Sequence, residues 1–315
     1  MPYGNDVDAS MLEFESCLDE NNVYTGPDGH EIKGVDCSSS VTAAWSQVAA
    51  SVDYTWTWQI LPYSKYRGSQ GTIPVGDYKL PDHGDIASNA TWEEARTHTG
   101  LVIGMNDVQT MCESYAKLLP ADAVVKYLMA GHTRMVSKAP VVVRKTDGTI
   151  DPRLSYITTI EIAGPPARNK DANGNQILTC WLVDYQYTFQ SLLDDCYIPI
   201  TCPELVSGEI PEPKVTLDSK QDVAAVKGLT GMVSSNYRLF RVKAVVTDAT
   251  GKEVSMAQAF PLNMVDLTMA SNYFNLDHLN NDLKIGSLSA GTYQLTLTVN
   301  VGTGERTVLT QAFQI

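Results

Sequence analysis

Apolar and polar positions follow one pattern in the first two thirds of the chain and another after residue 208. Directly after Cys37, apolar residues recur at helical spacing and predict a helix with one apolar face: Val41, Ala44, Trp45 and Val48. Strand-like runs rich in β-branched residues follow at 123–127, 133–136, 140–144 and 156–161. A helix followed by a series of strands predicts an α+β fold, without the regular alternation of a doubly wound sheet.

The interval between that helix and the strands has weak periodicity. Residues 56–100 are rich in Gly, Pro, Tyr and polar residues, so we expect long loops with one short helix at 92–96. A strand-like run follows at 97–103. Long loops in a compact domain often line a site, and this stretch is a candidate for that role.

A short segment with two prolines, residues 207–213, interrupts both helix and strand patterns and predicts a linker. Beyond it, alternating or β-branched runs occur at 215–217, 237–246, 293–299 and 307–315, with turn residues between them. This pattern predicts an antiparallel sandwich of immunoglobulin-like type, although the Cys…Trp…Cys spacing of antibody domains is missing. We therefore expect domains at 1–208 and 214–315, joined by a linker at 209–213.

Length and composition agree with two soluble domains. The chain has 315 residues, of which 43% are hydrophobic and 19% charged. No run reaches the roughly 18 apolar residues of a membrane helix, so no membrane span is predicted. Residues 1–6 lack the basic and apolar segments of a signal peptide. The chain is then either cytoplasmic or an exported protein whose signal is missing from this sequence.

The net charge of −13 is unevenly distributed. Residues 1–211 contain 14 basic and 27 acidic side chains, whereas residues 212–315 contain nine of each. Nucleic acids and anionic lipids bind to basic surfaces, so neither is expected as a partner.

The six cysteines form no CxxC pair, and we expect neither a structural zinc site nor a disulfide framework. Three of them lie close enough in sequence to pair in an oxidising compartment: Cys180, Cys196 and Cys202. Cys37 differs from the others in its context, because helix-starting serines follow it. In the first turn of a helix, free backbone N–H groups stabilise a thiolate and can bind an oxyanion. A small buried hydrophobic residue is the alternative interpretation of Cys37.

A cysteine nucleophile needs a base, and two of the five histidines are candidates. His98 and His132 each adjoin a strand-like run, while His30 and His83 lie in turn-like segments. The alternative for either candidate is an exposed or structurally satisfied histidine.

Two blocks of the sequence resemble NlpC/P60 cysteine peptidases. The first is Gly34-Val35-Asp36-Cys37-Ser38-Ser39 followed by the amphipathic helix, which is similar to the nucleophile motif of the family. The second is residues 119–124 followed by 130–136, where a turn and a strand precede a Gly-His pair. The resemblance selects His132 over His98; Ala121 stands where the family usually has glycine. The resemblance covers about residues 10–205, with a longer interval than usual at 54–117, interpreted as an insertion.

The resemblance implies a papain-like fold and a third catalytic residue on the strand after the histidine strand. Glu161 lies at that position, although the family more often uses His, Asn or Gln there. A carboxylate can orient the imidazole, whereas the alternative role for Glu161 is a surface residue at a strand end. Asp36, Ser39 and Arg134 are the candidate substrate contacts.

The function that the resemblance implies is hydrolysis of an amide bond in peptidoglycan stem peptides, typically between γ-D-glutamate and the following diamino acid. It implies no cofactor or metal, a monomer, and a secreted or cell-wall location. Two alternatives remain: an N-acetylmuramoyl-L-alanine amidase or other peptide amidase, and a catalytically idle module that binds cell wall or glycan.

Overall fold

The computed structural model forms helices and antiparallel sheets around two apolar cores. It describes residues 1, 3–4, 9–27, 32–52, 56–63, 71–81, 99–128, 130–170, 176–218, 222–261, 272–302 and 304–315, with backbone alone at 165–170 and 176–179. The first core draws its buried residues from positions 41 to 202 and the second from positions 223 to 313. Residues 208–214, between the two cores, belong to neither helix nor strand. The architecture is compatible with the α+β and β-sandwich classes predicted from the sequence.

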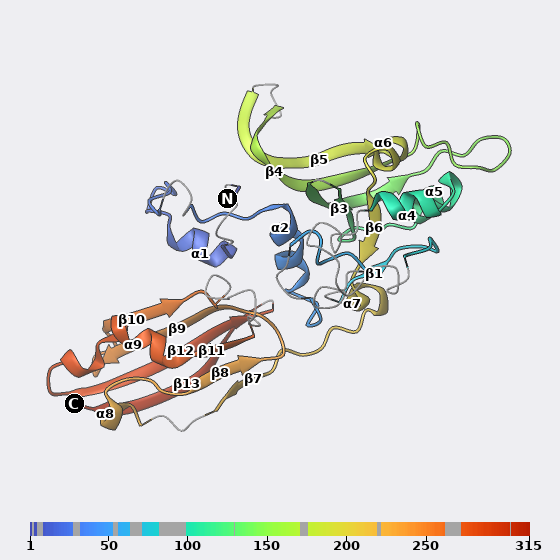
Figure 1. The fold of residues 1–315 in the computed structure, drawn as a ribbon. Coiled ribbons are helices and arrows are strands. Elements are labelled where there is room, and N and C mark those ends of the chain that lie inside the picture. Colours follow the sequence, from blue (N-terminus) through green and yellow to red (C-terminus); the bar gives the residue numbers. More distant parts are fainter. Residues whose placement is uncertain are drawn as a thin grey trace.

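A six-stranded sheet supports the first core (Figure 1). All neighbouring strands in it are antiparallel, in the order β1 (Ile73–Pro74), β6 (Ile198–Thr201), β2 (Ala123–Tyr127), β3 (Gly131–Val141), β4 (Tyr156–Lys170) and β5 (Gln176–Thr188). Strands β3 and β4 pair directly, and Met135 lies opposite Ile160. Side chains from different parts of the chain therefore meet on these two strands.

Helix α2 (Cys37–Trp45) packs against β3 and β4 and confirms the helix predicted after Cys37. Its last residue, Trp45, is buried, and the indole Nε1 donates a hydrogen bond to the carbonyl oxygen of Ala121 at 2.6 Å. This bond fixes the end of α2 to the turn that precedes β2. In Figure 1, α2 lies between the six-stranded sheet and the strands of the second core.

The remaining helices of this part were not predicted from the sequence. They are α1 (Met11–Ser16), α4 (Gly100–Met105), α5 (Val108–Ala116), α6 (Phe189–Asp194) and α7 (Pro203–Ser207). The strand expected at 97–103 is wrong, because Gly100 begins α4; a short apolar run does not distinguish helix from strand. The helix expected at 92–96 lies outside the described residues.

The strands of the first sheet were predicted well in its centre and poorly at its ends. The runs 123–127, 133–136 and 156–161 all lie in strands, within β2, β3 and β4. The separate strand expected at 140–144 is wrong: β3 continues to Val141, and Arg144 forms only an isolated bridge with Ile150. Strand β5 was not predicted. Among the described strands it pairs with β4 alone, and Val183 and Tyr185 on it are exposed, so burial does not impose a strong alternation.

Two further antiparallel sheets enclose the second core. The larger has the order β10 (Glu253–Ala259), β9 (Leu239–Asp248), β12 (Thr292–Val301) and β13 (Gly304–Gln314). The smaller has the order β11 (Tyr273–Asn275), β8 (Met232–Ser235) and β7 (Val215–Leu217). The runs predicted at 215–217, 237–246, 293–299 and 307–315 correspond to β7, β9, β12 and β13, apart from one to three residues at their ends.

The second core contacts the segment that follows α2. The hydroxyl of Tyr237 donates to the carbonyl oxygens of Pro211, at 2.7 Å, and Val48, at 3.3 Å. Ala50 packs against the second core although it belongs to the first part of the chain. These contacts join the linker, the end of the α2 segment and the C-terminal sheets.

All six cysteines are free, so the pairing considered for Cys180, Cys196 and Cys202 does not occur. Among the described residues, no helix combines the length and the apolar content needed to cross a membrane.

Candidate active site

A reciprocal pair of hydrogen bonds determines where α2 begins. The Asp36 carboxylate accepts from the backbone N–H of Ser39 at 2.7 Å, and the Ser39 hydroxyl oxygen accepts from the backbone N–H of Asp36 at 2.8 Å. This capping box makes Asp36 the N-cap, so Cys37 occupies the first turn of the helix. Asp36 and Ser39, two of the predicted substrate contacts, thus have a structural role. Their contact with a substrate stays a prediction.

The Cys37 thiol is buried, with 4% of the residue exposed. Its sulfur lies 3.8 Å from the hydroxyl oxygen of Thr57 and accepts hydrogen bonds from the backbone N–H groups of Thr133 and Ser38. Burial and the nearby negative charge of Asp36 raise the pKa of the thiol to about 11, although these donors act in the opposite direction. The donors at the helix start therefore do not offset the effects of burial and of Asp36 on this thiol.

His132 and Glu161 form a hydrogen-bonded pair across β3 and β4. The imidazole Nε2 of His132 bonds to Oε2 of Glu161, and the side chain of His132 keeps 17% exposure. With Nε2 engaged, Nδ1 is the ring atom that can exchange a proton with a thiol or an amine. Thr133, whose N–H contacts the Cys37 sulfur, is the residue directly after His132. The fold thus joins His132 directly to Glu161 and places Cys37 beside the residue that follows His132.

Glu161 is almost fully buried and has three hydrogen-bond donors. Besides His132, the Nε–H of Arg134 donates to Oε2 at 2.8 Å, and the hydroxyl of Tyr187 donates to Oε1. Burial by itself raises the pKa of this carboxyl, but the bonds from His132, Arg134 and Tyr187 outweigh burial and lower it. Glu161 is therefore ionised at neutral pH, as an acceptor for the imidazole N–H must be. It is not the exposed strand-end residue of the alternative interpretation.

Arg134 lies between two tyrosine rings. Its guanidinium carbon is 3.6 Å from the ring centre of Tyr187 and 4.2 Å from that of Tyr197. Only 8% of Arg134 is exposed, and its Nη1 is buried without a hydrogen-bond partner. The Tyr197 ring also meets the His132 ring edge to face, with centres 6.5 Å apart. Contact between Arg134 and a substrate carboxylate stays a prediction.

Thr57, Tyr187 and Tyr197 adjoin these groups but were not predicted as site residues. Thr57 belongs to the stretch interpreted as an insertion, yet it contacts the thiol, and a Cβ atom at Gly131 would lie 2.7 Å from the Cβ of Thr57. Glycine at 131 therefore leaves the room that Thr57 occupies. Strand β5, which carries Tyr185 and Tyr187, gives only a weak signal, because polar residues alternate with tyrosines just from Asp184 to Thr188. His98 lies outside the described residues.

The departure at Ala121 has a backbone explanation. Ala121 has a φ of +78°, in the left-handed region that glycine adopts without strain. Its carbonyl oxygen accepts the Trp45 indole N–H, and its own N–H donates to the carbonyl oxygen of Val136. These bonds hold the turn in this conformation despite the Cβ atom.

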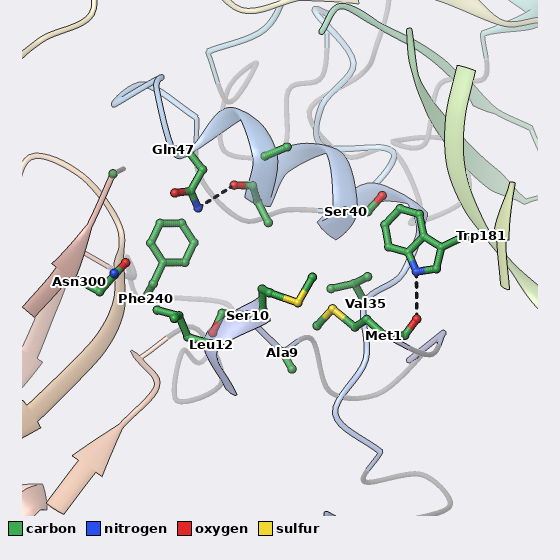
Figure 2. Close-up of a pocket in the computed structure, with 14 residues that line it drawn as sticks. Met1, Ala9, Ser10, Leu12, Val35, Ser40, Gln47, Trp181, Phe240 and Asn300 are labelled. Carbon is green, nitrogen blue, oxygen red and sulfur yellow. Dashed lines mark hydrogen bonds between the residues drawn. The ribbon is translucent and has the colours of Figure 1, made fainter. Parts of the chain in front are cut away.

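A cavity of about 450 Å³ lies away from the thiol, between the two parts of the chain (Figure 2). Ser40 of α2, Trp181 of β5 and Phe240 of β9 contribute to its mainly apolar wall, together with residues of the N-terminal segment. None of Cys37, His132 and Glu161 lines it. The cavity is therefore separate from the groups that could perform thiol chemistry.

Within the described ranges, no three side chains of His, Cys, Asp or Glu converge as a metal site would require. No protein-family model matches the chain, and a search of curated proteins returns no match.

Proposed function

We propose that this chain is a cysteine hydrolase of NlpC/P60 type, with Cys37 as nucleophile, His132 as base and Glu161 as the residue that orients His132. The main support is the contact between Glu161 and His132 beside a cysteine in the first turn of a helix. The sequence resemblance supplies the family and a papain-like fold for the first domain, residues 1–208. The strand pattern after the linker is the basis for an immunoglobulin-like fold of residues 214–315.

The proposed reaction proceeds in two stages. His132 Nδ1 accepts the Cys37 proton as the sulfur bonds to the amide carbon of the substrate. The resulting oxyanion accepts hydrogen bonds from backbone N–H groups at the start of α2. The C–N bond then breaks as the imidazolium passes the proton to the leaving nitrogen. In the second stage His132 takes a proton from water, whose oxygen attacks the thioester carbon. The C–S bond breaks, the product acid leaves, and the thiol regains its proton.

The raised pKa of the Cys37 thiol affects the first stage. Because the thiol is protonated at neutral pH, proton transfer to His132 accompanies the attack on the amide instead of preceding it. An imidazole held by an ionised carboxylate is suited to this task, since Glu161 stabilises the positive charge that the ring gains.

The proposed substrate is a peptidoglycan stem peptide, cut between γ-D-glutamate and the diamino acid. Purified muropeptides are the direct test, with products identified by mass spectrometry, because product masses distinguish this bond from the muramoyl–alanine bond. We expect turnover by the natural sequence and none by Cys37→Ala. Cys112→Ala is the matched control, since Cys112 is also a buried free thiol whose pKa burial raises to about 11. Activity that survives in Cys37→Ala would contradict the proposed mechanism.

The burial of the Cys37 thiol favours a second candidate function, a wall- or glycan-binding module without catalysis. This candidate predicts that the natural sequence and Cys37→Ala bind intact cell wall equally and that neither changes the muropeptide masses. Wall sedimentation together with the digest separates the two candidates.

A further inference from the structure

We propose that Arg134 is a positioning residue that balances the charge of Glu161, so that Glu161 orients His132 without holding it as an imidazolium. The inference rests on the proposed function and adds to it a determinant of the pH range in which the base works. It concerns a side chain that the sequence predicts only as a candidate substrate contact.

One carboxylate oxygen receives both nitrogen partners. Oε2 of Glu161 is the acceptor for His132 Nε2 and for Arg134 Nε, whereas Oε1 accepts from the Tyr187 hydroxyl. Each carboxylate oxygen has two lone pairs, so Oε2 can serve two donors at once. Arg134 therefore competes directly with His132 for the same negative charge.

The balance matters because Glu161 is buried. A carboxylate in a site of low dielectric strongly favours a proton on a neighbouring imidazole. An imidazole that already carries this proton cannot accept another from a thiol. The permanent positive charge of Arg134 makes its pair with Glu161 neutral overall. The imidazole of His132 therefore keeps an oriented hydrogen-bond acceptor that does not present a full negative charge.

The two tyrosine rings explain how an arginine is kept in this position. The guanidinium carbon lies 3.6 Å from the ring centre of Tyr187 and 4.2 Å from that of Tyr197, so the cation is enclosed from two sides. Tyr187 lies near the end of β5 and Tyr197 directly before β6, so helix α6 separates them in the sequence and the fold brings their rings together. A lysine has the charge but lacks the planar group that stacks and donates from Nε.

Other charged or titratable groups surround the cluster without replacing Arg134. They are Lys126 of β2, whose ammonium is 5.1 Å from the Tyr197 ring centre, Asp195 near Tyr197, and Cys37 with Asp36 at the start of α2. Arg134, in contrast, is bonded directly to Glu161, at 2.8 Å.

The test is a histidine NMR titration, because it reports on His132 whether or not the protein turns over a substrate. Isotope-labelled histidine is followed with pH in the full chain and in Arg134→Met, and the His132 signal is assigned with His132→Gln. We expect the protonation midpoint of His132 to rise by about one pH unit in Arg134→Met. Arg144→Met is the matched control, since Arg144 pairs with Glu113 at the surface, and it should leave the midpoint unchanged.

Two further variants distinguish charge from packing. Arg134→Lys keeps the charge and should restore most of the natural midpoint. Tyr187→Phe keeps the ring but removes the hydrogen-bond donor to Oε1 of Glu161, so we expect a smaller rise in the protonation midpoint of His132. This variant also provides a test if Arg134→Met fails to fold. An unchanged or lowered midpoint in a folded Arg134→Met, or in Tyr187→Phe if the former does not fold, would overturn the inference. If muropeptides are cleaved, the acid limb of kcat/KM should shift in the same direction as the midpoint.

Discussion

The imidazole Nε2 of His132 meets Oε2 of Glu161 across neighbouring strands, 29 positions apart in the sequence. This contact joins a partly exposed ring to an almost fully buried carboxylate. Glu161→Gln keeps the shape of the side chain but removes its charge, so it tests whether the carboxylate supports His132 as the base. We expect kcat/KM for muropeptide cleavage to fall at least about 100-fold, because the amide stabilises an imidazolium poorly. A variant that retains natural activity would show that Glu161 is not needed for the reaction.

The same carboxylate predicts how stability depends on pH. The pKa of Glu161 is lowered in the folded chain, so the unfolded chain binds more protons as the pH falls. The stability contributed by the ionised Glu161 is thus fully present above the pKa of an ordinary carboxyl group, which is its pKa in the unfolded chain. It is lost as the pH falls through the lower pKa that Glu161 has in the folded chain. Urea unfolding between pH 7 and 3 should show the natural sequence losing its advantage over Glu161→Gln on acidification. A constant difference across this range would contradict the prediction.

The Cys37 thiol should react slowly at neutral pH. Since its pKa is raised to about 11, the thiolate fraction grows nearly tenfold per pH unit until the pH approaches that value. Iodoacetamide labelling, followed by peptide mass spectrometry, should give a Cys37 rate that still increases from pH 8 to 10. A rate that is already constant at pH 8 would mean that the thiolate forms far more easily than its burial implies.

Gly131 leaves the space that Thr57 fills beside the thiol. A Cβ atom at position 131 would approach the Thr57 Cβ to 2.7 Å, so Gly131→Ala must displace one of the two segments. We expect a loss of about 1–3 kcal/mol in the free energy of unfolding, as for other overpacked sites, together with reduced activity. Gly148→Ala is not a suitable comparison because its φ is +85°, whereas Gly104→Ala meets no atom within 4 Å and serves as the control.

Ala121→Gly should stabilise the protein. The φ of +78° is unfavourable for alanine by roughly 1–2 kcal/mol, and glycine removes this strain while adding some entropy to the unfolded chain. The expected net gain is about 0.5–1 kcal/mol, measurable by urea unfolding. Ala249→Gly, at an exposed turn residue without positive φ, should bring no gain. A destabilised Ala121→Gly would indicate that the hydrogen bonds of this turn depend on the methyl group.

Parts of the fold and of the site were predictable because their signals are local. The start of α2 follows from Asp36 and Ser39, which are three residues apart, and the strands β2, β3 and β4 follow from short β-branched runs. Edge strand β5 and helix α5 were missed, since an exposed strand and a short helix produce weak patterns.

The sequence by itself determined which residues can do chemistry: a cysteine placed to begin a helix, and a histidine directly after a glycine at the start of a strand. Only the tertiary structure decided how these groups behave. Arg134 and Tyr187 reach Glu161 across 27 and 26 positions, and Thr57 reaches Cys37 across 20. The reason is physical: a cap depends on neighbours along the chain, whereas burial and charge depend on whatever the strand pairing brings close.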